Sequence, residues 1–157
     1  MLKNKILIDV IGLLSIALVA VVGYKLSPML LPKADVTVQP DAACDLNRSP
    51  CSAVLPGGGK LTLALSPRPI PMVKPFKVEV RFEGFAAERV EVDFSGVDMN
   101  MGLNRPVLVN AGNGVFAGEG TLPVCVTGRM AWQATLLIET AKERIAVPFR
   151  FDSQDHE

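Results

Sequence analysis

Sulfur-bearing side chains gather in two short segments of the chain. One segment carries Met99 and Met101, and the other carries Cys125 and Met130. Thiolate and thioether sulfur are soft ligands that select Cu(I) over hard cations. The single histidine, His156, lies in a polar tail far from these segments, which disfavours zinc and Cu(II). The four sulfur ligands therefore predict a Cu(I) site, provided that the fold brings the two segments together.

Extended backbone would allow this arrangement. In a strand Met99 and Met101 point to the same side, because side chains alternate between the two faces. A turn just after Cys125 would let it lie near Met130 at one end of a β fold. The alternative is ordinary packing, because methionine is a common filler of irregular apolar gaps. In that interpretation Trp132 is the large aromatic residue of the same core, and Cys125 belongs to a disulfide.

No set of residues typical of an enzyme active site accompanies the sulfur ligands. The sequence contains no Ser/His/Asp set, no histidine that would activate Cys125, and no paired carboxylates for a metal. The glycines at 57–59 indicate a turn, since no helix is expected after them. Arg105 and Arg129 would suit an anion, but solvated surface arginines are the simpler explanation. We therefore predict a protein that is not an enzyme.

The three cysteines bear on the cellular compartment. Cys44 and Cys51 enclose six residues rich in turn formers, and a disulfide between them would contribute about 2.5 kcal/mol in the chain-entropy model. Three single pairings are possible, and the turn residues favour this one. Such a disulfide indicates an oxidising compartment, whereas three reduced cysteines would fit the cytoplasm. A thiol–disulfide enzyme is disfavoured, because no Cys-x-x-Cys is present.

An apolar N-terminal segment precedes the elements that must position these residues. Residues 6–24 are apolar except for Asp9 and Ser15, and as a helix they would extend ~28 Å, close to the thickness of a hydrocarbon core. A cleaved signal peptide usually has a shorter apolar run and a small-residue cleavage site. We therefore expect an uncleaved transmembrane anchor over residues 1–25, with the rest of the chain in the periplasm.

The remainder of the chain has the pattern of β-strands. After an extended linker expected over residues 26–50, apolar and polar side chains alternate along several runs. The expected strands are 61–65, 76–82, 90–94, 106–109, 115–118, 131–139 and 144–151. Short strands with frequent turns predict an all-β domain, an immunoglobulin-like antiparallel sandwich over residues 51–152, followed by a polar tail over 153–157. A small barrel has the same signature.

The charge of the chain excludes one class of partner. Sixteen basic residues are balanced by 16 acidic residues, and the isoelectric point is about 6.6. Such a chain has no basic footprint for nucleic acid. The inner membrane and its proteins are the expected partners.

Several short motifs resemble those of the FixH-like and YtkA-like membrane-anchored domains. Besides the apolar N-terminal segment, the motifs are Lys-Pro-Phe-Lys-Val-Glu-Val, Val-Asp-Met-Asn-Met-Gly, Gly-Val-Phe-Ala-Gly-Glu-Gly and Gly-Arg-Met-Ala-Trp. The resemblance covers roughly residues 60–151. It implies an immunoglobulin-like periplasmic domain that takes part in copper handling or in the assembly of haem-copper oxidases. It also puts Met99, Met101 and Met130 at methionine-bearing positions, although the chain lacks the histidines of a His/Met copper chaperone.

Two functions follow as expectations. The first is an accessory protein that binds Cu(I) through Met99, Met101, Cys125 and Met130, and serves a haem-copper oxidase or its assembly proteins. The second is a scaffold that binds no metal, and whose helix and one sheet edge contact a membrane complex.

Overall fold

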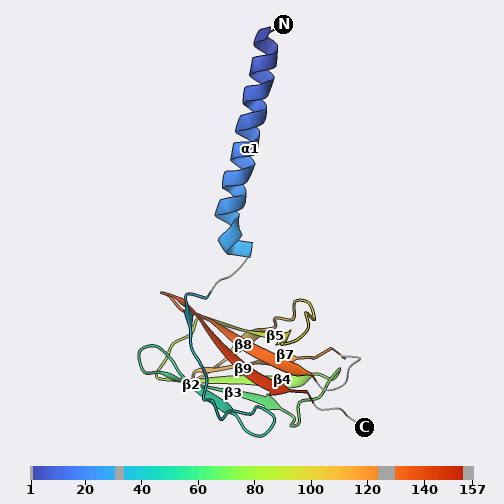
Figure 1. Cartoon of the computed structure of the whole chain (residues 1–157). Coiled ribbons are helices and arrows are strands. Elements are labelled where there is room, and N and C mark those ends of the chain that lie inside the picture. The colour runs from blue at the N-terminus through green and yellow to red at the C-terminus, as the bar shows by residue number, and fades with distance from the viewer. Residues whose placement is uncertain (1, 31–33, 124–129, 154–157) are drawn as a thin grey trace. The chain divides into compact units, whose positions relative to one another are not determined.

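The computed structural model describes residues 2–30, 34–123 and 130–153 of the chain, which divides into two units (Figure 1). The first unit, Met1–Lys33, contains helix α1 (Leu2–Leu30). The second unit, Ala34–Glu157, contains the strands.

Helix α1 has apolar side chains on all its sides rather than along one stripe. They include neighbouring residues, such as Leu13 and Leu14 at 71% and 64% exposure. The hydroxyl of Ser15 donates to the Ile11 carbonyl at 2.8 Å, so this polar group is satisfied within the helix. The helix extends five residues beyond the segment expected as an anchor. Among the described residues, no helix meets the combined length and apolarity that crossing a membrane requires.

Nine strands among the described residues form one curled sheet in the second unit. They are β1 (Val36–Thr37), β2 (Cys51–Val54), β3 (Lys60–Ser66), β4 (Phe76–Glu83), β5 (Arg89–Gly96), β6 (Val107–Gly112), β7 (Val115–Gly120), β8 (Ala131–Glu139) and β9 (Arg144–Asp152). Their order across the sheet is β1-β9-β8-β5-β6-β7-β4-β3-β2. Neighbours are antiparallel except for the parallel pair β1 and β9. The predicted all-β domain is confirmed, and the predicted strands correspond to β3–β9.

The core lies between two parts of this sheet that face each other. In β4, buried and exposed side chains alternate strictly, as period-two patterning requires. The rings of Phe76 on β4 and Phe94 on β5 meet edge to face with centroids 5.4 Å apart, although these strands are not neighbours in the sheet. At Gly120 an added Cβ would lie 2.9 Å from both rings. The sheet therefore curls so that the inward-facing side chains of β4 and β5 pack against each other.

Residues 34–50 differ from the expected extended linker. They contribute β1 to the sheet and a fully buried side chain, Leu46, to the core. The Asp35 N–H donates to the Arg144 carbonyl at 2.8 Å, and the Asp35 carboxylate accepts from the Arg144 N–H at 2.9 Å. These contacts dock the segment against the start of β9. Isolated apolar residues such as Leu46 do not produce a strand pattern, although each can fill a position in the core.

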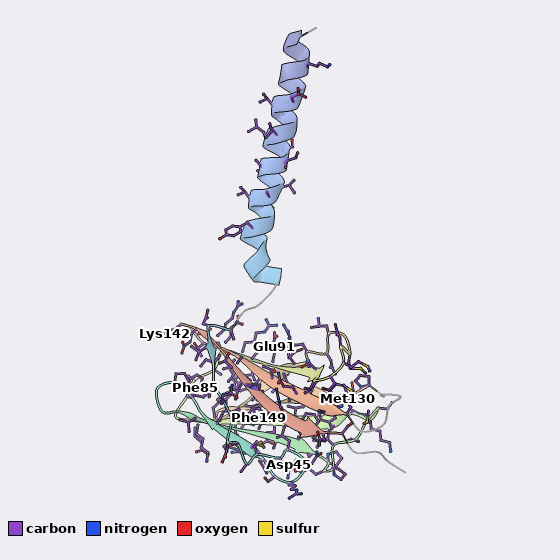
Figure 2. All side chains as sticks on the ribbon, viewed as in Figure 1. Asp45, Phe85, Glu91, Met130, Lys142 and Phe149 are labelled. Atoms are coloured by element: carbon purple, nitrogen blue, oxygen red, sulfur yellow. A yellow bond between two sulfur atoms is a disulfide. The ribbon has the colours of Figure 1, made fainter. Side chains whose placement is uncertain are left out.

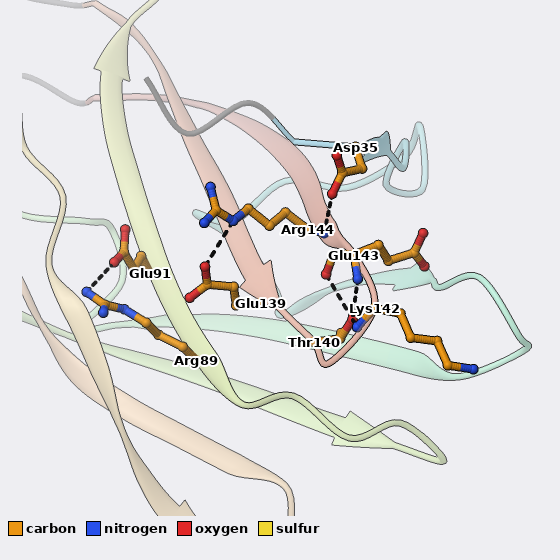
Figure 3. Close-up of polar contacts among 8 residues, drawn as sticks. All are labelled: Asp35, Arg89, Glu91, Glu139, Thr140, Lys142, Glu143 and Arg144. Atoms are coloured by element: carbon orange, nitrogen blue, oxygen red, sulfur yellow. Dashed lines mark hydrogen bonds and ion pairs between the residues drawn. The ribbon is translucent and has the colours of Figure 1, made fainter. Parts of the chain in front are cut away.

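Polar contacts close the end of the domain where β8 turns into β9 (Figure 3). Thr140 Oγ1 donates to the Glu143 carbonyl at 2.8 Å and holds the turn. Arg144 Nε lies 2.9 Å from Glu139 Oε1, and Asp35 docks beside it. The segment that begins at Ala34 therefore joins the β domain at this end, which we call the entry end.

Candidate functional site

Two of the predicted sulfur ligands meet at a glycine. Gly96 ends β5 and is paired with Trp132 of β8. A Cβ added at Gly96 would overlap the terminal methyl group of Met130 and the Met99 carbonyl oxygen, and would lie 3.3 Å from Met101 Cγ. The side chains of Met101 and Met130 thus approach each other over this glycine. We call Gly96, Met99, Met101 and Met130 the methionine cluster.

The three methionines differ in exposure, and together they reach from the core to solvent. Met130 is buried at 6% exposure, Met101 is half-buried against the core, and Met99 is 46% exposed. An open hollow of about 290 Å³ is lined by residues 95–102. The Asn100 carboxamide accepts the Gly102 N–H at 2.9 Å and shapes the loop around this hollow. Met99 is therefore open to solvent, whereas the side chain of Met130 packs into the core.

The tryptophan next to the cluster is a core residue. Trp132 is fully buried, and it is the largest fully buried side chain among the described residues. Its indole N–H has no hydrogen-bond partner within the described part of the chain. Trp132 is paired with Gly96 of the cluster across the β5–β8 pair. As the only tryptophan of the chain, it is a natural fluorescent reporter for this site.

Cys125 and Arg129 fall in residues 124–129, which lie outside the described residues. The fourth predicted sulfur ligand therefore stays a prediction. Arg105, the other arginine considered for an anion, has a carboxylate partner, since its Nη2 lies 3.5 Å from Asp93 Oδ2. This half-buried pair explains the position of Arg105 without an external anion.

The predicted disulfide between Cys44 and Cys51 is present, with its Cα atoms 5.4 Å apart. The enclosed loop is tied to the domain by more than the disulfide. Asn47 donates to the Asp152 carbonyl at 2.7 Å and accepts the Ile70 N–H at 3.3 Å. The loop is therefore anchored to the end of β9, next to the residue that follows it, Ser153.

Sequence reasoning missed Gly96 and Ser153 as parts of the site. Gly96 continues the inward-facing series of β5, where a large apolar residue would be expected at that position. A glycine at an inward position of an alternating strand indicates close approach of another group. The sequence of residues 90–96 contains this pattern. Ser153 belongs to the expected polar tail, but its side chain is fully buried. Nothing in its local sequence predicts this burial.

Figure 2 places Met130 and Lys142 at opposite ends of the domain. Strand β8 runs between them, from Ala131 beside the cluster to Glu139 at the entry end. Its nine residues span about 27–30 Å at the usual rise per residue of a strand. The methionine cluster thus lies at the end of the β domain opposite the entry end.

Within the described residues, no group of three or more His, Cys, Asp or Glu side chains is arranged to hold a metal ion. No protein-family model, curated protein or solved structure matches the chain. The resemblance to FixH-like and YtkA-like domains accordingly stays a prediction.

Proposed function

We propose that this chain is a membrane-anchored periplasmic accessory protein whose methionine cluster binds Cu(I). The observation that carries the proposal is the meeting of Met101 and Met130 over Gly96. These two side chains come from segments far apart in the sequence, and the fold brings them to the same glycine, as two ligands of one metal site would require. The role served by this binding is delivery of copper to a haem-copper oxidase, or to the proteins that assemble it.

The chemistry of the cluster suits a soft, singly charged ion. Thioether sulfur is neutral and polarisable, so it favours Cu(I) over hard divalent cations. Met101 and Met130 are held by the core, while Met99 stands at the solvent-exposed rim. A long unbranched side chain at the rim can adjust its rotamers to complete a coordination shell. Cys125 is the fourth ligand in this proposal.

The strand order supports an immunoglobulin-like sandwich. Strands β3-β4-β7-β6 lie in the order A-B-E-D of an immunoglobulin constant-type domain, and β5-β8-β9 lie in the order C-F-G. The order begins at β1 and ends at β2, which favours an open sandwich over a closed barrel. We therefore propose an immunoglobulin-like domain, with β1 as an additional strand on β9.

The N-terminal helix supports membrane attachment through its composition. A helix that is apolar on all sides needs an apolar environment around its whole circumference. In α1 the described apolar side chains are exposed, including Ile16 at 72% and Val19 at 71%. We propose that the lipid of the inner membrane covers this surface. The Cys44–Cys51 disulfide supports a periplasmic location for the second unit.

Membrane attachment predicts a specific fractionation result. The full chain should stay in the membrane pellet after extraction with alkaline carbonate, because carbonate strips peripheral proteins but leaves inserted helices in place. Thiol labelling of intact cells should modify Cys44 and Cys51 only after a reductant is added. Release of the full chain by carbonate would contradict the anchor, and labelling of Cys44 or Cys51 without reductant would contradict the oxidising location.

The Cu(I) site is tested by removing sulfur while retaining packing. In the variant Met101→Leu/Met130→Leu, we expect the Kd for Cu(I) to rise at least about tenfold, because leucine keeps the apolar volume but removes the soft ligands. The measurement is an anaerobic titration of the full chain in detergent against a competing Cu(I) chelator. Trp132 fluorescence provides a second readout.

The matched control is Met72→Leu. Met72 is also half-buried and packed against the core, so this variant makes the same chemical change outside the cluster. Its affinity for Cu(I) should equal that of the unaltered chain. If replacement of Met99, Met101, Cys125 and Met130 together leaves the affinity unchanged, the proposed site is wrong.

A second candidate function, a scaffold without metal, is favoured by one surface feature. Leu103 is 83% exposed and Val109 on β6 is 72% exposed, so both apolar side chains are accessible to a partner. Under this candidate, association with a membrane complex would survive the methionine substitutions but would be weakened by Leu103→Ser/Val109→Ser. Crosslinking in membranes, performed with both variants, distinguishes the two functions.

A further inference from the structure

Ser153, the residue that follows β9, is joined to Met130 by three hydrogen bonds. The Ser153 N–H donates to the Met130 carbonyl at 2.8 Å, and the Met130 N–H donates to Ser153 Oγ at 3.1 Å. The Ser153 hydroxyl donates in turn to the same Met130 carbonyl at 3.2 Å. Both backbone groups of Met130 are therefore satisfied by one residue.

The burial of Ser153 is unusual for its type. Of the residues that the structure describes, it is the one polar side chain in the buried class, with 0% exposure. A buried hydroxyl is tolerated when its hydrogen-bonding capacity is used, as it is here. The regular β8–β9 ladder ends at the pair Ala131 and Asp152. Ser153 thus continues the hydrogen bonding between β9 and β8 one residue beyond the ladder, and its partner there is the backbone of Met130, a proposed metal ligand.

A second contact holds the segment that carries Ser153. The preceding carbonyl, that of Asp152, accepts a hydrogen bond from Asn47 at 2.7 Å. Asn47 belongs to the loop closed by the Cys44–Cys51 disulfide. Ser153 therefore connects Met130 to the end of β9, and Asn47 in turn holds the end of β9 in place.

We infer that Ser153 is a positioning residue of the Cu(I) site, which sets the backbone of Met130 so that its thioether reaches over Gly96. This inference rests on the proposed function. Groups that orient a metal ligand without touching the metal commonly affect affinity about 10- to 100-fold. Ser153 acts on the ligand backbone rather than on the sulfur, so the low end of that range applies.

The test compares two serine-to-alanine variants of the full chain in detergent. Ser153→Ala removes the hydroxyl that accepts the Met130 N–H, and we expect the Kd for Cu(I) to rise about tenfold. The matched control is Ser52→Ala, which removes a hydroxyl bonded to Thr62 at 3.1 Å on the β2–β3 pair. Its Kd should not change. Both Kd values are measured by chelator competition at a temperature where circular dichroism shows each variant to be fully folded.

The possible outcomes separate this inference from the function on which it rests. A raised Kd for Ser153→Ala, beside an unchanged Kd for Ser52→Ala, supports the positioning role. An unchanged Kd in folded Ser153→Ala overturns the inference alone, as does an equal rise in both variants. If the unaltered chain binds no Cu(I), the proposed function fails and the inference fails with it.

Discussion

Replacing both Cys44 and Cys51 by alanine is expected to lower the free energy of unfolding of the β domain by about 3 to 4 kcal/mol. The disulfide closes a short loop, and in the chain-entropy model this closure alone contributes about 2.5 kcal/mol. The remainder comes from the contacts of the loop, which depend on the loop staying closed.

Two contacts make the loop part of the folded domain. Leu46 is fully buried, and burying a leucine side chain contributes about 1.5–3 kcal/mol relative to leaving it exposed. Asn47 bridges the Asp152 carbonyl and the Ile70 N–H. Without the disulfide, ordering the loop costs more conformational entropy, so part of this contribution is lost as well.

The measurement is urea unfolding of the full chain in detergent, followed by Trp132 fluorescence. Reduction of the unaltered chain should reproduce the loss seen in the double variant, and a reductant should have no further effect on that variant. Cys125→Ser is the control, because its disulfide is intact and its stability should remain sensitive to reduction. If the double variant unfolds at the same urea concentration as the unaltered chain, the loop does not contribute to stability as proposed.

The strands that sequence could predict are those with one buried and one exposed face. In β4 and β8 each side chain alternates strictly between core and surface, and this period of two is visible without any tertiary information. Strand β1 has two residues and β2 has four, which is too short for a period to emerge. Pairing with β9 and β3 creates these two strands, so their sequences alone could not indicate them.

The sequence could predict those parts of the candidate site that depend only on residue type and on near neighbours in the chain. The sulfur atoms of Met99, Met101 and Met130 could be read directly, and the bend between Cys44 and Cys51 favoured the correct disulfide. What local sequence cannot show is that the end of β5 lies beside the start of β8, so that Gly96 lies under Met130. Nor can it show that Ser153 would be buried against Met130, because this depends on the register of β9 along β8.

Replacing Gly96 by alanine is expected to destabilise the domain by about 3 kcal/mol, the upper end of the usual range for overpacking a core. The new methyl group would overlap Met130 Cε and the Met99 carbonyl oxygen. The methionine methyl group is the end of a flexible chain and can move, but the carbonyl oxygen belongs to the backbone and can yield only if the loop shifts. The same displacement moves two proposed ligands, so the affinity for Cu(I) should fall together with stability.

A double-mutant cycle with Met130→Ala identifies the cause of this loss. If the Met130 side chain fills the space over Gly96, shortening it should relieve part of the overlap. Gly96→Ala/Met130→Ala should then be more stable than the sum of the single effects by about 1 kcal/mol, within the range seen for residues in contact. Urea unfolding of the four proteins measures this coupling. Strict additivity would mean that Met130 does not occupy the space over Gly96, and the Cu(I) proposal would lose the observation that carries it.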